Sequence, residues 1–111
     1  MKWSKDRATR HKQMASLLRA GLAYQVRGLR EKHGWTRRQL YLKSGVSPHT
    51  IKSIEEGTRK NISTKSLEKI ATAFNVALIV RFVAFSEVYE FRAIPLSFGD
   101  DPAFKRGIVK P

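Results

Sequence analysis

Four short polar or basic side chains lie close together in the segment between Gly45 and Gly57. The segment begins with Ser47-Pro48, an N-cap residue followed by proline at the first helical position, and Gly57 ends it, which predicts a short helix. Ile51 and Ile54 define its buried face. The outward positions are then occupied by His49, Thr50, Lys52 and Ser53. Because such side chains hydrogen-bond to base edges in a major groove, the spacing predicts a base-reading surface.

A second short helix is predicted immediately before this one. Thr36 is expected to cap it, Leu40 to anchor it in the core, and Ser44-Gly45 to end it. Two short helices joined by a tight turn form a helix-turn-helix, and Gly45 supplies the positive φ that such a turn requires. The side chains expected to pack where the two helices meet are Leu40, Val46, Ile51 and Ile54.

Two further helices are predicted on either side of this unit. Apolar residues spaced by three or four indicate a helix from near Lys12 to Lys32, ended by His33-Gly34. Trp35 is expected to close the core between this helix and the next. Another helix should begin at Ser63 or Thr64, with its inward face formed by Leu67, Ile70, Ala71 and Phe74.

The stretch as a whole resembles the phage repressor/Cro-like family, also called the xenobiotic-response-element family, over about residues 22–76. The residues that carry the resemblance are Val26-Arg27-Gly28-Leu29-Arg30-Glu31, Thr36, Gln39-Leu40, Ser44-Gly45-Val46-Ser47, Thr50-Ile51, Ile54-Glu55-Glu56-Gly57 and the stretch from Leu67 to Phe74. The resemblance implies a mainly α protein, a compact helix-turn-helix domain of four to five helices. One residue departs from the pattern. Tyr41 stands where the family usually has a small residue, so its ring should point outward or widen the helix crossing.

The resemblance also assigns the DNA contacts. The third helix enters the major groove, and the second helix and the loop after the third hold phosphates. Base contacts are then expected from Arg37, His49, Thr50, Lys52 and Ser53. Contacts to the DNA backbone are expected from Thr36, Arg38, Gln39, Ser47, Arg59, Lys60 and Asn61.

The residues from Ala77 to Phe85 are rich in β-branched and aromatic side chains, which predicts a strand. A lone strand leaves its backbone groups unpaired, so we expect it to pair antiparallel with its copy in a homodimer. Some members of the family carry such a dimerisation strand. The interface residues would be Leu78, Ile79, Val80, Phe82, Val83 and Phe85. The predicted organisation is a basic arm or helix extension (1–19), the DNA-binding domain (20–76), the dimerisation strand (77–91) and an irregular tail (92–111).

The charge of the chain indicates an anionic partner. Twenty-two Lys and Arg stand against nine Asp and Glu, a net of +13. Residues 1–76 hold seventeen basic and five acidic side chains, a net of +12, whereas residues 77–111 hold five and four, a net of +1. The first part is therefore the one suited to a polyanion such as nucleic acid.

Catalysis and cofactor chemistry find little support. The chain has no Cys, and the three His have no metal-ligand spacing, so no metal or other cofactor is expected. Neither the His nor the Ser residues have the partners that a nucleophile needs, and the protein is not expected to be an enzyme. Glu55 and Glu56 point about 100° apart on a helix, so we expect them at its solvated end, with one salt bridge to Arg30 or Arg27.

The longest apolar run, from Val76 to Phe85, is interrupted by Arg81 and falls short of the about 20 residues that span a membrane. No membrane association and no secretory signal are expected, and the prediction is a cytoplasmic, nucleoid-associated protein of a bacterium or phage. The leading function is a sequence-specific transcriptional regulator, a homodimeric repressor or autorepressor at a pseudo-palindromic operator. The alternatives are an antitoxin that masks a toxin partner and a protein that binds structured RNA.

Overall fold

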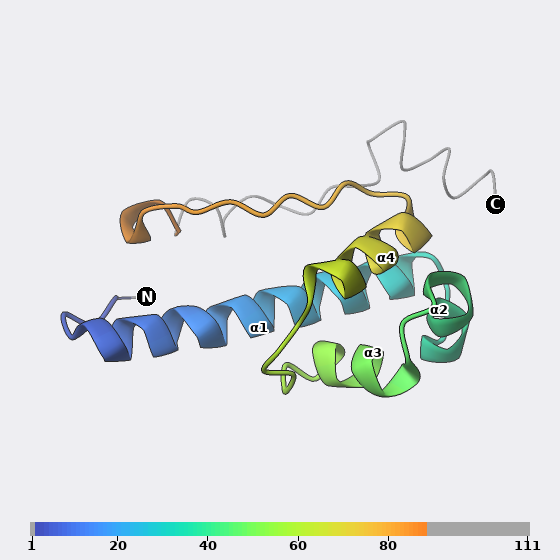
Figure 1. Ribbon diagram of the computed structural model, residues 1–111, viewed down its shortest axis with the longest axis horizontal. Coiled ribbons are helices and arrows are strands. Elements are labelled where there is room, and N and C mark those ends of the chain that lie inside the picture. The colour runs from blue at the N-terminus through green and yellow to red at the C-terminus, as the bar shows by residue number, and fades with distance from the viewer. Residues whose placement is uncertain (1, 89–111) are drawn as a thin grey trace.

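The computed structural model describes residues 2–88 and consists mainly of helices (Figure 1). In chain order these are α1 (Arg7–Lys32), α2 (Arg37–Ser44), α3 (Pro48–Glu55), α4 (Thr64–Phe74) and the short 3-10 helix η1 (Phe85–Glu87). The predicted tail (92–111) and the last residues of the predicted strand region (77–91) lie outside the described residues.

The three short helices begin where the sequence predicts. Thr36 and Gln39 form a capping box: the Thr36 hydroxyl accepts from the Gln39 amide at 3.1 Å, and the Gln39 side chain accepts from the Thr36 amide at 2.8 Å. Ser47 and Ser63 cap α3 and α4 in the same way, with Oγ accepting a backbone amide in the first turn. These side chains satisfy amides that have no partner within the helix.

Helix α1 begins five residues before the predicted start near Lys12. Asp6 caps it, because its Oδ2 accepts from the Thr9 amide at 2.9 Å and from the Thr9 hydroxyl at 2.7 Å. The apolar periodicity starts only at Met14, so the prediction missed the polar first turns. The helix runs unbroken to Lys32.

The turn between α2 and α3 depends on Gly45. Its φ is 76°, in the left-handed region, and its amide donates to the Tyr41 carbonyl at 2.8 Å. An L side chain rarely adopts this backbone conformation. The glycine therefore lets α2 end and α3 start in a different direction within a few residues, as predicted.

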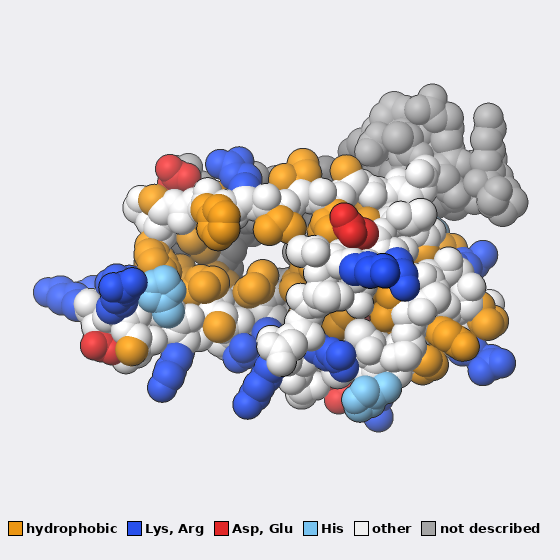
Figure 2. All heavy atoms as spheres, in the orientation of Figure 1, with side chains coloured by type: hydrophobic (Ala, Val, Ile, Leu, Met, Phe, Trp, Pro, Cys, Tyr) orange, Lys and Arg blue, Asp and Glu red, His pale blue; other side chains and the backbone are white. Residues whose placement is uncertain are grey.

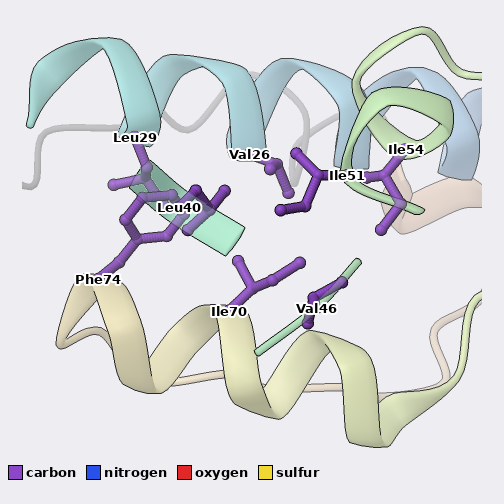
Figure 3. Close-up of a cluster of buried hydrophobic side chains, with 8 residues drawn as sticks. All are labelled: Val26, Leu29, Leu40, Val46, Ile51, Ile54, Ile70 and Phe74. Carbon is purple, nitrogen blue, oxygen red and sulfur yellow. The ribbon is translucent and has the colours of Figure 1, made fainter. Parts of the chain in front are cut away.

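The core lies where α1, α2, α3 and α4 meet (Figure 3). Its side chains are Val26, Leu29, Leu40, Val46, Ile51, Ile54, Ile70 and Phe74. Trp35, between α1 and α2, stacks on the Phe74 ring with centroids 5.6 Å apart. It closes the core as expected, although against α4 as well. Tyr41 is half-buried and packs on the core, so its ring is not turned fully outward.

The predicted strand is not present in residues 2–88. After Asn75 the chain turns and runs back along α1 as an extended segment (Figure 1), here called the return segment (77–85), which has no backbone partner strand in the described part of the chain. Its end docks on the start of α1: Trp3 Nε1 donates to the Phe85 carbonyl at 3.0 Å, and the two rings lie edge to face with centroids 4.9 Å apart. The guanidinium of Arg10 lies 5.0 Å from the centre of the Phe85 ring.

Candidate nucleic-acid interface

The four predicted base-reading side chains of α3 divide into two pairs. His49 and Lys52 are exposed and, three residues apart, lie on one side of the helix. Thr50 and Ser53 are half-buried and bound locally: Ser47 donates its hydroxyl to Thr50 Oγ1 at 2.9 Å, and Ser53 donates to the Thr50 carbonyl at 2.9 Å. His49 and Lys52 are therefore the more accessible pair.

Helix α3 is fixed to its neighbours by a buried carboxylate. The side chain of Glu55 is 0% exposed and receives two hydrogen bonds from Arg30 of α1, from Nε at 2.7 Å and from Nη2 at 2.8 Å. Arg37 of α2 donates from Nε to the same carboxylate at 3.2 Å. The hydrogen bonds with Glu55 raise the pKa of Arg30 above its ordinary value. One carboxylate thus joins three helices.

The expectation that Glu55 lies at a solvated helix end was wrong. The predicted salt bridge to Arg30 is present, whereas Arg27 pairs with Glu31 at 2.9 Å. A buried carboxylate needs compensating partners, and two guanidinium groups provide them here. The signal in the sequence for a salt bridge to Glu55 was the presence of basic residues in the neighbouring helices. The spacing of these residues alone does not show which of them reaches the carboxylate.

Arg37 has a role that the sequence did not indicate. It was expected to reach a base or phosphate, yet its Nε is bound to Glu55 and its side chain is 37% exposed. Its Nε is therefore used within the protein. Its position ties the start of α2 to the end of α3.

The residues expected at phosphates lie at the two helix starts and in the loop after α3. Thr36, Gln39 and Ser47 are exposed and cap helices, and Arg38 is exposed without a capping role. In the loop, Arg59 donates from Nε to the Asn61 carbonyl at 3.2 Å. The side chains of Lys60 and Asn61 are exposed.

The helix-turn-helix family model matches residues 26–80, which cover the end of α1, all of α2, α3 and α4, and part of the return segment. The chain belongs to the helix-turn-helix family. Neither a curated protein nor a solved structure matches it. The match of the family model confirms the resemblance to the phage repressor/Cro-like proteins. Proteins of this family bind DNA and regulate transcription. The partner of this helix-turn-helix protein is therefore DNA.

Two further findings concern the described residues of this helix-turn-helix protein. None of the helices in residues 2–88 is long and apolar enough to cross a membrane. Among the same residues there is no group of three or more His, Asp or Glu side chains that could hold a metal ion.

The expected dimer residues of this helix-turn-helix protein are mostly exposed. Phe82 is fully exposed (104%), and Ile79 and Val80 are exposed by 78% and 70%. Leu78 and Val83 are near one third exposed. Phe85 differs because its ring contacts Trp3 of the same chain, a contact that the sequence did not predict.

Proposed function

We propose that this protein is a homodimeric, sequence-specific transcriptional repressor or autorepressor that binds a pseudo-palindromic operator. The observation that carries the proposal is the fixed orientation of α3. Because Glu55 is bound to both Arg30 and Arg37, the exposed His49 and Lys52 are presented on a rigid helix. Rigid presentation favours reading of base edges, which demands good hydrogen-bond geometry.

In the proposed complex the two exposed side chains of α3 contact bases first. His49 and Lys52 donate to base acceptors, and Thr50 and Ser53 join after a hydroxyl rotation, since each already has a local partner. The free N–H groups of Arg37 reach the adjacent backbone or base. Contacts to phosphates come from Thr36, Arg38, Gln39, Ser47, Arg59, Lys60 and Asn61.

The dimer is proposed from the return segment. Burying one large apolar side chain contributes about 1.5–3 kcal/mol, and Ile79, Val80 and Phe82 are exposed in a single chain. An extended segment with unpaired backbone edges also favours strand addition. Antiparallel pairing with a second copy satisfies both, and binding to an operator requires that the two α3 helices of this dimer lie about one DNA turn, roughly 34 Å, apart.

Selection of bound duplexes from a random pool tests the proposal. We expect an inverted repeat whose half-sites are centred about 10 base pairs apart. With the net of +12 in residues 1–76, we also expect log affinity to fall with log salt as for about six or more neutralised phosphates per dimer. An absence of enrichment, or a flat salt response, would overturn the proposal.

An antitoxin is the second candidate, because the same exposed return segment could cover a toxin in place of a second copy. The protein would then still bind DNA. Co-purification with one stoichiometric small protein, together with a monomer in its absence, distinguishes this candidate from the homodimer. Competition by structured RNA against the selected duplex at physiological salt tests the RNA-binding alternative.

A further inference from the structure

The first half of α1 is basic and carries no acidic side chain. Between residues 7 and 30 the helix contains six Arg or Lys and no Asp or Glu. Residues 7–18 amount to about 18 Å of helix at 1.5 Å per residue, and they precede the part matched by the family model. This projecting half of α1 therefore extends the basic surface beyond the helix-turn-helix.

Two of these cations lie on the side of α1 that faces α3. Lys12, Arg19 and Val26 are spaced by seven residues, close to two helical turns, so they share one face. Val26 is buried in the core, and Arg30, one turn later, reaches Glu55 at the end of α3. Gly57, just after α3, lies against the backbone of Arg19, since a Cβ placed there is 3.9 Å from the Arg19 carbonyl. Figure 2 shows Lys and Arg side chains along the edge of the molecule on which α3 lies, beneath the projecting half of α1.

Lys12 and Arg19 have no ion-pair partner within residues 2–88. The pairs in this part of the chain join Arg27 to Glu31, Arg30 and Arg37 to Glu55, and Lys52 to Glu56. Arg10 differs, because it lies over the Phe85 ring and donates to backbone carbonyls before the helix. Lys12 and Arg19 are thus available to an external anion, and Gly57 places Arg19 next to the loop that carries Arg59 and Lys60.

We propose that Lys12 and Arg19 bind phosphates of the DNA that flanks each half-site, beyond the loop 58–61. The inference rests on the proposed function, because it needs α3 in the groove of the same duplex. A rise of about 10 Å separates the two positions along α1. They therefore continue the row of phosphate contacts outward without reading any base, and raise affinity for every flanking sequence alike.

The test compares the double variant Lys12→Gln/Arg19→Gln with Lys65→Gln/Lys69→Gln. The control removes the same charge from exposed positions of α4, which lies above α3 in the view of Figure 1. Glutamine is close to lysine and arginine in helix propensity, so both variants should fold, which circular dichroism checks. Each protein is titrated with the selected operator as a short duplex that ends at the half-sites and as a long duplex with about 10 further base pairs on each side.

On the long duplex we expect the Lys12→Gln/Arg19→Gln variant to bind at least roughly tenfold more weakly than the wild type. Its slope of log affinity against log salt should be shallower by about 3 to 4, since four phosphate contacts per dimer are lost. On the short duplex the variant should match the control. Hydroxyl-radical protection outside the half-sites should disappear in the variant alone.

The outcomes separate this inference from the proposed function. If the wild type selects no duplex, the proposed function is wrong, and this inference with it. If the wild type binds its operator and the double variant keeps the slope and flanking protection of the control, the inference is overturned while the proposed function stands.

Discussion

The residues from 22 to 76, here called the core domain, differ from the two outer segments, which are the projecting half of α1 and the return segment. In the core domain the apolar side chains bury one another, with Leu40, Ile51 and Phe74 at 0% exposure, and the buried carboxylate of Glu55 has two cationic partners. In the outer segments, Phe82 is fully exposed and Leu18 is 56% exposed.

This difference separates one part of the chain, whose apolar side chains bury one another, from two parts whose apolar side chains remain exposed. The core domain satisfies its buried apolar side chains and its buried carboxylate within itself. The outer segments contact each other where Arg10 and His11 of α1, together with Trp3 before it, surround Phe85. In the proposed complex, a second copy and a DNA duplex cover their remaining apolar and basic surface. Substitutions in the core domain should therefore change folding, and those in the outer segments should change association.

The largest effect is expected at Glu55. Glu55→Gln leaves the guanidinium groups of Arg30 and Arg37 without their anion, and Arg30 is only 13% exposed. Breaking a buried ion pair at one partner costs about 3 kcal/mol or more. Urea denaturation should show this loss, with Glu56→Gln as the control, because Glu56 is 45% exposed and 3.9 Å from Lys52. Equal stability of the two variants would mean that the Glu55 network does not fix α3.

Phe82→Asp should separate association from folding. A charge at this fully exposed position leaves the core domain intact but opposes burial in an apolar dimer interface. We expect monomers by light scattering and a loss of operator affinity of roughly 100-fold, since two linked recognition helices bind far more tightly than one. Ser86→Asp, with the same charge in the neighbouring 3-10 helix, should remain dimeric. A dimeric Phe82→Asp protein would show that the return segment pairs elsewhere.

A pair of glycines tests the backbone of the core domain. Gly45→Ala should destabilise the fold by about 1 kcal/mol because its φ is 76°, although no atom lies within 4 Å of the added Cβ. Gly28→Ala, inside α1 and equally free of contacts, should stabilise by up to about 1 kcal/mol. Thermal unfolding of both variants gives the comparison, and shifts of the same sign would contradict it.

The smallest effect concerns the N-cap of α1. Hydrogen bonds from the Thr9 hydroxyl and amide lower the pKa of Asp6 below its ordinary 3.8. A lowered pKa in the folded state means that the ionised carboxylate stabilises the helix start above pH 3.8, and that this contribution is lost as the pH falls through the folded value. NMR should detect Asp6 titrating below 3.8, together with the Thr9 amide. A midpoint at or above 3.8 would show that the cap is not formed.

The sequence predicted most of the core domain because local rules and burial agree there. Caps at Thr36, Ser47 and Ser63, and the positive φ of Gly45, follow from residue type within one turn of chain. The apolar spacing of Leu40, Ile51 and Ile54 similarly indicated one buried cluster. Base-reading candidates on α3 followed directly from that spacing, since the buried face determines the outer one.

What the sequence did not predict depends on contacts between distant residues. Phe85 docks on Trp3, 82 positions earlier in the chain, and nothing local to either residue indicates the other. Glu55 likewise receives Arg37 from 18 positions away, a contact that was not predicted, whereas Arg30, from 25 positions away, was one of two partners that the sequence left open. The sequence predicted a strand from Ala77 to Phe85, but a strand requires a partner, and a single chain provides none in residues 2–88.

The two tryptophans of the chain lie in different parts of this comparison. Trp35 stacks on the buried Phe74 ring, whereas Trp3 contacts Phe85 at the far end of α1. With phenylalanine in place of one or the other, the fluorescence of the remaining indole follows either unfolding of the domain or release of the docked end. The two tryptophans thus report separately on unfolding of the domain and on release of the docked end. The rates of these two events can be compared without an added dye.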